Sequence, residues 1–441
     1  MMKVAFYLTN RNIADKDCRN VLDGNPGIGG TYYAMLLLAQ LISLRPETDV
    51  ELVVFAESLG KLPAGVPCEQ TENLQELSKK IETKKIDILV VNKIGKNTLD
   101  KSFFHAIRNN NVKVVIWAHC FISYPDLVRY AKNKKIFRIV AVGKEQLMTF
   151  CDHSAFKKST YIYNICNYPI VKSVPFRERS NNVVYIGSIV SLKGLHLLTK
   201  AWPMILKEFP DANLFVIGSG KLYNKNAKLG KYGIAEYFYE KKLLKPILDA
   251  KGSIIPSVHF CGIMGREKYD ILKTAKVGVP NPSGLTETFG FTAIEMQLAG
   301  CSVTTIKCPG YLDTIYDKKA LYSDPSQLAD FVIARLKQKK YDADSAIQFV
   351  ESEFSAEKIL PQWYALFREV YEGKSCETKI YNTLLESSIR KIKNRKLQLF
   401  CSFLPSLMFY EWIFGNIFYF FSRMVHIYDT IHKIIRRYIW T

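Results

Sequence analysis

One stretch of the chain decides its fold: Val277-Gly-Val-Pro280, then Asn281, then Pro282-Ser-Gly-Leu-Thr-Glu287-Thr-Phe-Gly290-Phe-Thr-Ala-Ile-Glu295. A short apolar run is followed by a turn that contains glycine, and the turn is followed by apolar residues at helical spacing. A strand, a loop and a helix in this order make one unit of a parallel α/β sheet. The loop then lies at the carboxyl end of its strand, which is the edge where open α/β sheets bind ligands.

The same unit recurs along most of the chain. Continuous apolar runs of about four to eight residues, rather than strict alternation, indicate parallel strands that are covered on both faces. The helical segments between the runs predict an α/β protein with two doubly wound, Rossmann-like domains. The predicted strands are Lys3–Thr9, Val50–Ala56, Ile86–Asn92, Val112–Ala118, Arg138–Val142, Thr160–Tyr163, Val183–Gly187, Asn213–Ile217, Val258–Cys261, Val277–Pro280 and Ser302–Ile306.

Changes in composition divide the chain into parts. Residues 1–168 carry the first set of strands, and prolines with the polar run Arg177-Glu-Arg-Ser-Asn-Asn182 predict a linker over 169–182. The second set of strands predicts a domain over 183–350, and the pattern over 351–372 predicts a closing helix. Residues 373–441 form a basic and aromatic tail.

The overall composition limits the protein class and its partners. The 441 residues hold 61 Lys or Arg and 41 Asp or Glu, a formal net charge of +20, and 48% are hydrophobic. This excludes a collagen or a largely disordered chain, and it leaves nucleic acid, an anionic membrane face or a polyanionic small substrate as candidate partners. The ten cysteines include no Cys-x-x-Cys pair, and Met1–Asn10 predicts a strand rather than a signal peptide. Both observations favour a reducing, cytoplasmic setting.

Two carboxylates eight positions apart, Glu287 and Glu295, flank the start of the predicted helix. Phe289-Gly290 would open that helix, so its free backbone N–H groups and positive dipole end could face a phosphate. Glu295 would lie about one turn into the helix, within reach of ribose hydroxyls. For either Glu alone, the simpler interpretation is an acidic helix N-terminus favoured by the dipole.

Three further loops follow predicted strands. Gly187 and Ser188 lead to Lys193, whose ammonium group could contact a diphosphate, although a lone loop lysine is usually a solvated surface residue. Gly218-Ser-Gly220 lacks the third glycine of a dinucleotide fingerprint. Gly29 and Gly30 either permit close approach of a ligand or simply form a turn. His119 ends a predicted strand at the ligand-binding edge of the sheet, which makes it a candidate site residue.

Residues 1–372 resemble the retaining glycosyltransferases of family four (group 1 type), which have the GT-B fold of two Rossmann-like domains facing a cleft. The resemblance rests on Gly187…Lys193-Gly194, on Gly218-Ser-Gly220, and on Glu287-x7-Glu295 with Phe289-Gly290. Gly29-Gly30 and His119 are minor matches.

The resemblance implies that the second domain binds a UDP- or GDP-sugar donor. Glu295 would hold the ribose, and Lys193 would hold the diphosphate with the backbone of Phe289 and Gly290. Glu287 would contact hydroxyls of the donor sugar, and His119 would line the reaction centre. The catalytic set is therefore Glu287, His119 and Lys193, and the other donor-binding residues are Gly29, Gly30, Gly187, Ser188, Gly218, Phe289, Gly290 and Glu295.

The sequence departs from the family pattern at two places. The family has Arg where this chain has Ser188, so one charge partner of the diphosphate is missing, and another basic residue such as Lys221 would have to replace it. The family's later Gly-Gly…Glu loop corresponds to Pro309-Gly310-Tyr-Leu-Asp313.

The resemblance implies transfer of a sugar, with retention, to a glycan or lipid-linked acceptor in cell-surface polysaccharide or lipopolysaccharide synthesis. No metal or other cofactor is expected, and Asp15-Lys-Asp17 and Asp342-Ala-Asp344 are interpreted as surface residues because neither follows a buried strand. Two alternatives stay open: a sugar-nucleotide epimerase of the same fold, and a basic protein that binds nucleic acid or membrane without catalysis. No nucleic-acid motif accompanies the charge, so nucleic acid is not expected as a partner.

The tail predicts attachment to a membrane. Residues 373–441 hold eleven Lys or Arg against four acids, a surplus of seven, and Leu397–Phe421 carries a single charge, Glu411. Pro405 and polar residues interrupt this segment, so aromatic side chains flanked by cations favour an interfacial anchor over a spanning helix or a dimerisation arm. We expect a cytoplasmic protein, peripheral on the anionic inner face of the plasma membrane.

Overall fold

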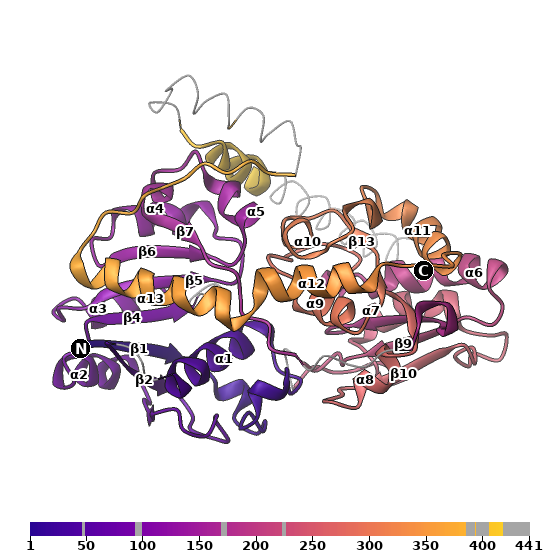
Figure 1. Cartoon of the computed structure of the whole chain (residues 1–441), viewed down its shortest axis with the longest axis horizontal. Coiled ribbons are helices and arrows are strands. Elements are labelled where there is room, and N and C mark those ends of the chain that lie inside the picture. The colour runs from indigo at the N-terminus through magenta and orange to yellow at the C-terminus, as the bar shows by residue number, and fades with distance from the viewer. Residues whose placement is uncertain are drawn as a thin grey trace, which may run out of the picture.

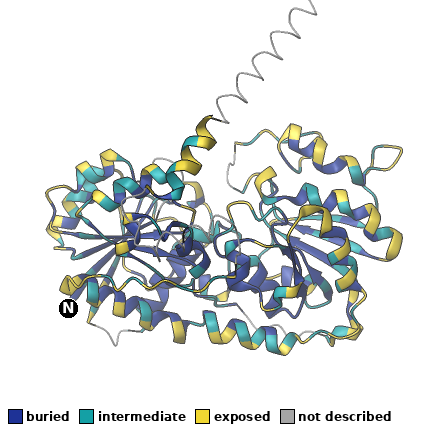
Figure 2. Ribbon diagram, turned by 90° about the horizontal axis from the view of Figure 1, so that it is seen from above, coloured by how far each residue is buried: buried dark blue, intermediate teal, exposed yellow. Residues whose placement is uncertain are grey.

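Two α/β domains lie side by side in the computed structural model, one built mainly from each half of the chain (Figure 1). The structure describes residues 1–45, 49–92, 99–168, 174–222, 226–384, 393 and 405–417. Each domain has a wholly parallel sheet, and the strands are buried while the outward faces of the helices are exposed (Figure 2). The predicted class, α/β with parallel sheets, is confirmed.

The first domain has the strand order β3-β2-β1-β4-β5-β6-β7. The predicted strands agree with the observed ones to within two residues, because each is an apolar run buried between helices. The short edge strand β3 was not predicted, because it has only three residues, two of them polar. The strands are β1 (Met2–Leu8), β2 (Val50–Ala56), β3 (Cys68–Gln70), β4 (Ile88–Asn92), β5 (Lys113–Ala118), β6 (Ile136–Ala141) and β7 (Ser159–Tyr161), and the helices are α1 (Gly30–Leu44), α2 (Leu74–Thr83), α3 (Lys101–Ala106), α4 (Tyr124–Lys132) and α5 (Lys144–Leu147).

The second domain has the strand order β10-β9-β8-β11-β12, with a separate parallel pair, β13 and β14. The prediction of one strand over Ser302–Ile306 is wrong, because the pairing partner changes at Thr304. Its N–H still donates to the Gly278 carbonyl of the sheet (2.9 Å), whereas its Oγ1 donates to the Ala320 carbonyl (2.7 Å) and the next two residues pair with Leu321 and Tyr322. The strands are β8 (Ser180–Ile186), β9 (Asn213–Ile217), β10 (Val258–Gly262), β11 (Ala275–Gly278), β12 (Ser302–Val303), β13 (Thr305–Ile306) and β14 (Leu321–Tyr322), and the helices are α6 (Leu195–Glu208), α7 (Tyr237–Leu244), α8 (Lys268–Leu272), α9 (Phe291–Leu298), α10 (Pro309–Thr314) and α11 (Leu328–Leu336).

The polar run before β8 contains a buried anchor. β8 begins at Ser180, three residues before the predicted start, and Arg179 is buried beside it. The Arg179 guanidinium donates to the carbonyls of Ala275 (2.8 Å), in β11, and Ala299 (2.8 Å), directly after α9. A run that looks like a solvated linker therefore fixes the first strand of the sheet.

The chain returns to the first domain through its last long helix. The closing helix predicted over 351–372 corresponds to α13 (Ala356–Glu372), which runs along the first domain (Figure 1). It follows α12 (Ala343–Phe354) after a break at Ser355. Ile359, Trp363 and Phe367 are fully buried in the same core as β1 and α1. The first domain therefore takes part of its core from the far end of the chain.

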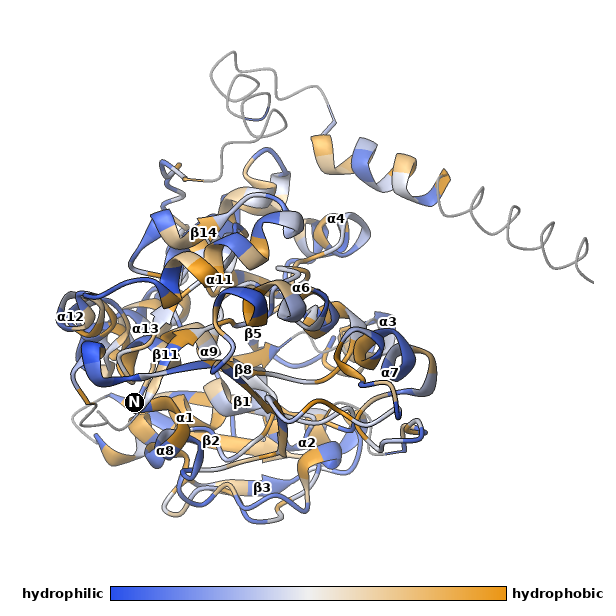
Figure 3. Ribbon diagram, turned by 90° about the vertical axis from the view of Figure 1, so that its right-hand side faces the viewer, coloured by the Kyte–Doolittle hydropathy of each residue, from blue (hydrophilic) through white to orange (hydrophobic). Residues whose placement is uncertain are grey.

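A described part of the tail lies against the first domain. Asp152 accepts hydrogen bonds from Ser406 Oγ (2.9 Å) and from the Leu407 N–H (2.7 Å). The Asp152 carboxylate thereby caps a helix over 407–417, and this helix projects beyond the domains (Figure 3). The predicted apolar segment Leu397–Phe421 lies outside the described residues except for 405–417. Within the part of the chain that the structure describes, no helix is both long and apolar enough to cross a membrane.

Candidate active site

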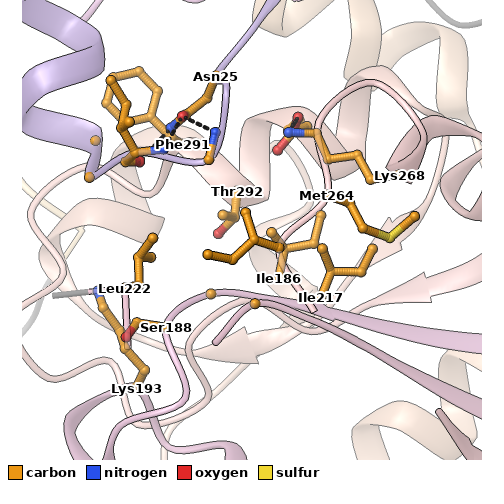
Figure 4. Close-up of a pocket in the computed structure, with 18 of the residues that line it drawn as sticks. Asn25, Ile186, Ser188, Lys193, Ile217, Leu222, Met264, Lys268, Phe291 and Thr292 are labelled. Carbon is orange, nitrogen blue, oxygen red and sulfur yellow. Dashed lines mark hydrogen bonds and ion pairs between the residues drawn. The ribbon is translucent and has the colours of Figure 1, made fainter. Parts of the chain in front are cut away.

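An open cavity lies between the domains, beside the loops that follow β8 and β11 (Figure 4). Eight predicted site residues line it: Gly29, Gly30, Gly187, Ser188, Lys193, Gly218, Glu287 and Glu295. Lining residues that the sequence analysis missed include Asn25, Lys268, Asn281 and Thr292. His119, Phe289 and Gly290 lie outside its lining.

Glu287 and Lys193 come together from two different loops. Lys193 Nζ lies 2.9 Å from Glu287 Oε2, and both side chains are largely buried. Asn281 Nδ2 donates to the same carboxylate oxygen (3.0 Å), and it also donates to the Leu285 carbonyl (3.2 Å). The carboxylate is therefore held by one cation and one amide at the carboxyl ends of β8 and β11, which is where parallel sheets bind ligands.

The loop that carries Glu287 has unusual backbone angles. Asn281 has φ of 25° and Thr286 has φ of 60°. A β-branched residue such as threonine rarely adopts a positive φ, because its side chain crowds the backbone there. Such conformations persist where surrounding contacts enforce them, and they concentrate at functional sites. The loop is thus fixed in a shape that sets the Glu287 side chain against Lys193.

Glu295 is paired at another point of the cavity wall. Its Oε1 lies 2.7 Å from Lys268 Nζ and accepts a hydrogen bond from the Tyr269 hydroxyl (2.8 Å). Burial, followed by the charge of Glu295, raises the pKa of Tyr269 far above its ordinary value, so this hydroxyl stays a donor. Lys268 lies at the opposite end of the cavity from Lys193 and Ser188 (Figure 4).

Two glycines are required by close approach of other atoms. A Cβ on Gly218, where φ is 147°, would lie 1.8 Å from the Gly187 carbonyl oxygen. A Cβ on Gly30 would lie 2.9 Å from the Phe291 ring, so this glycine lets the first domain approach α9 of the second. Asn25 shapes the same loop, because its Oδ1 accepts from the N–H groups of Gly27 (3.0 Å) and Ile28 (2.9 Å).

The start of α9 presents different residues from those predicted. Gly290 is the N-cap residue, and Phe291 and Thr292 of the first turn line the cavity. Phe289 is buried instead, and its carbonyl accepts a hydrogen bond from Thr314 Oγ1 (2.8 Å) on α10. The left-handed turn at Gly290 (φ 91°) directs the preceding backbone toward α10 and away from the cavity.

His119 directly follows β5, and it is buried and does not line the cavity. Its ring lies 4.5 Å from the Trp117 ring, and its carbonyl accepts a hydrogen bond from Thr288 Oγ1 (2.7 Å), next to Glu287. Burial lowers the pKa of His119 to about 3, so the imidazole is neutral at physiological pH. His119 thus contacts the Glu287 loop through its backbone.

The lowered pKa predicts a pH dependence of stability. Below about pH 6.5 the unfolded chain binds a proton at His119 that the folded chain does not, so acid favours unfolding. Between pH 6.5 and 4.5 this contributes a loss of about 2 kcal/mol. We expect His119→Asn to show a correspondingly shallower fall in the free energy of unfolding, measured in urea at each pH. His105→Asn, at an exposed position, is the control, and equal pH slopes for His119→Asn and the unmodified protein would contradict the prediction.

The two departures from the family pattern have different outcomes. Lys221 is exposed and does not line the cavity, so it does not occupy the place of the missing Arg at Ser188. Asp313, on α10, joins the domains, because it accepts hydrogen bonds from the Glu145 N–H (2.9 Å) and the Tyr163 hydroxyl (3.3 Å) of the first domain. Burial raises the pKa of Asp313 to about 6.

Comparisons with known proteins agree with this geometry. Residues 169–346 match the family Glycosyl transferases group 1. An uncharacterized glycosyltransferase of Haemophilus influenzae is 22% identical over 229 residues, which cover 50% of this chain and 63% of that protein. An uncharacterized glycosyltransferase of Methanocaldococcus jannaschii is 25% identical over 167 residues, which cover 33% of this chain and 38% of that protein. The chain thus spans less than two thirds of each of these relatives.

A solved structure shares the fold over most of the chain. The crystal structure of a glycosyltransferase from Rickettsia africae superimposes with a TM-score of 0.61 at 13% identity, over 85% of this chain and 99% of that one. At this identity the likeness concerns the fold. Residues 169–346 are therefore a glycosyltransferase group 1 domain, and the chain as a whole shares the two-domain α/β fold of the Rickettsia africae protein.

Proposed function

We propose that the protein is a glycosyltransferase that moves a sugar from a UDP- or GDP-sugar to a hydroxyl of a glycan or lipid-linked acceptor, with retention of configuration. The observation that carries the proposal is the Lys193–Glu287 pair, held at 2.9 Å in the interdomain cavity of a group 1 domain. Synthesis of a cell-surface polysaccharide or lipopolysaccharide is the process that we propose for it.

The chemistry places different demands on the two ends of the donor. The bond between the anomeric carbon and the diphosphate oxygen breaks, a bond to the acceptor oxygen forms, and the proton of the acceptor hydroxyl passes to the released diphosphate. Negative charge builds on the departing diphosphate, where the Lys193 ammonium and the first-turn N–H groups of α9 would stabilise it. The Glu287 carboxylate would accept hydrogen bonds from hydroxyls of the donor sugar.

We propose further that transfer needs no metal ion, because Lys193 and the first-turn N–H groups of α9 supply positive charge at the diphosphate end of the cavity. The two Asp-x-Asp strings have structural contacts: Asp17 pairs with Arg19 (2.5 Å), and Asp342 caps α12 through the Ser345 N–H (3.0 Å). Activity should therefore survive dialysis against EDTA, and loss of activity that Mn²⁺ or Mg²⁺ restores would contradict this part of the proposal.

The proposed function is tested on the full-length protein with a panel of UDP- and GDP-sugars. We expect one of these nucleotide sugars to raise the melting temperature of the protein. Its sugar should appear on a glycan or lipid-linked acceptor, and NMR of the product should show that the anomeric configuration is retained. Glu287→Gln should abolish transfer and leave the circular dichroism spectrum unchanged. Conversion of the nucleotide sugar without any acceptor would favour the epimerase. Salt-dependent binding of random DNA, with no response to the panel, would favour a nucleic-acid-binding protein.

We also propose that the tail attaches the protein to the anionic inner face of the plasma membrane, where a lipid-linked acceptor lies. The helix over 407–417 exposes Tyr410, Trp412, Phe414 and Ile417. Aromatic side chains of this kind insert at the membrane–water interface.

A double substitution in this helix tests membrane attachment. We expect Trp412→Ser with Phe414→Ser to weaken sedimentation with phosphatidylserine-containing vesicles by about tenfold or more, because two aromatic side chains no longer leave water. Phe238→Ser, at a 77% exposed position on α7, is the matched control. Equal vesicle binding of the double variant and the unmodified protein would exclude this helix as the anchor.

A further inference from the structure

Lys268 and Glu295 form a buried ion pair in the wall of the donor cavity. Lys268 is the first residue of α8 and Glu295 lies in α9, so two separate helices bring the charges together. Their side chains are only 6% and 3% exposed, and Nζ lies 2.7 Å from Oε1. Burying two charges costs desolvation energy that a well-packed apolar pair would avoid, so the pair is poorly explained by stability alone.

The protein makes polar contacts with only one of the two carboxylate oxygens of Glu295, within the part of the chain that the structure describes. The Lys268 ammonium and the Tyr269 hydroxyl both contact Oε1. Among the residues that the structure describes, none donates a hydrogen bond to Oε2, although Glu295 lines the cavity. One oxygen is thus fixed by the protein, and the other is left as an acceptor toward the cavity.

Apolar side chains also line this end of the cavity. Ile186, Ile217 and Met264 lie near Lys268 in the cavity wall (Figure 4). A hydrogen-bond acceptor beside apolar side chains suits a nucleoside, whose base is flat and whose ribose carries two adjacent hydroxyls. Lys193 and Ser188 lie at the opposite end, beside Glu287, which is the end suited to the diphosphate and the sugar.

We propose that Lys268 and Tyr269 are positioning residues that hold Glu295 for the ribose hydroxyls of the donor, and that they thereby make the enzyme select ribonucleoside diphosphates. The inference rests on the proposed function, because it assumes a nucleotide donor in this cavity. Neither residue need touch the reacting atoms. Their effect is to keep the Glu295 carboxylate turned so that Oε2 meets the ribose.

The test compares the binding of UDP and GDP with that of their 2′,3′-dideoxy counterparts by isothermal titration calorimetry on the full-length protein. For the unmodified protein we expect a preference of about 10- to 100-fold for the ribonucleotide, because a hydrogen bond to a charged acceptor is lost in the analogue. Lys268→Met should reduce this ratio to about threefold or less, and Lys268→Arg should largely restore it. Tyr269→Phe, which keeps the ring, should give an intermediate ratio.

Two further variants separate positioning from a merely structural role. The double variant Lys268→Met/Glu295→Gln removes both charges of the pair, so no unpaired charge is left buried. It should fold normally but lose the preference for the ribonucleotide. The control is Lys273→Met, directly after α8, which breaks only the exposed ion pair between Lys273 and Asp270. This variant should keep the full preference for the ribonucleotide. An unchanged ratio in folded Lys268→Met, or in the double variant, would overturn the inference. If the unmodified protein bound neither UDP nor GDP, the proposed function itself would fail.

Discussion

Replacing Lys193 with Met is expected to lower sugar transfer by about 100- to 1000-fold, the usual effect of removing one charge-stabilising group from a transition state. Lys193 is within 2.9 Å of Glu287, so its loss also leaves that carboxylate without its cation, close to where charge builds on the diphosphate. Both changes oppose departure of the nucleotide. The fall should be mainly in kcat, because the charge develops only as the sugar leaves.

The measurement is the initial rate of transfer at saturating donor. Lys200→Met, on the exposed face of the helix that follows Lys193, should transfer at the unmodified rate. A kcat for Lys193→Met within threefold of the unmodified protein would remove Lys193 from the proposed mechanism. A raised KM with kcat unchanged would instead assign it to ground-state binding of the donor.

Replacing Trp363 with Ala is expected to lower the free energy of unfolding of the first domain by about 3–5 kcal/mol. Trp363 is fully buried, and its ring lies 4.6 Å from Trp117 and 5.7 Å from Phe367. The truncation would leave a large void in a core that two elements distant in sequence share, and packed strands cannot close such a void fully.

The stability change is measured by urea denaturation, followed by circular dichroism. Tyr371→Ala, at an exposed position of the same helix, is the matched control and should cost less than about 1 kcal/mol. If Trp363→Ala unfolded at the urea concentration of the unmodified protein, α13 would not belong to the cooperative core of the first domain.

The strands were the most predictable part of this molecule. β2 and β9 have the bounds that their apolar runs indicate, because parallel strands covered on both faces leave an unbroken hydrophobic signal. Glu287 and Lys193 were also predictable as separate candidates, since each follows a strand at the ligand-binding edge. Their mutual contact was not, because 94 residues separate them and only the sheet order joins them.

The residues that sequence reasoning missed owe their roles to tertiary contacts. Lys268 lies in an ordinary polar stretch, and nothing local shows that its side chain is buried against Glu295. Arg179 falls within the predicted linker because its neighbours are polar, yet its guanidinium donates to the carbonyls of Ala275 and Ala299. Asn281 could have been found, because it is a polar residue directly after a buried strand and beside the quoted motif.

The return of α13 to the first domain has a consequence for how the protein is made. The core around β1 stays incomplete until Trp363 and Phe367 have been translated, long after Tyr161 at the end of β7. At about 5–20 residues per second, this leaves apolar surface uncovered on the ribosome for roughly 10–40 seconds. The nascent first domain is thus a natural client for chaperones, and a fragment that stops before α13 should aggregate rather than fold.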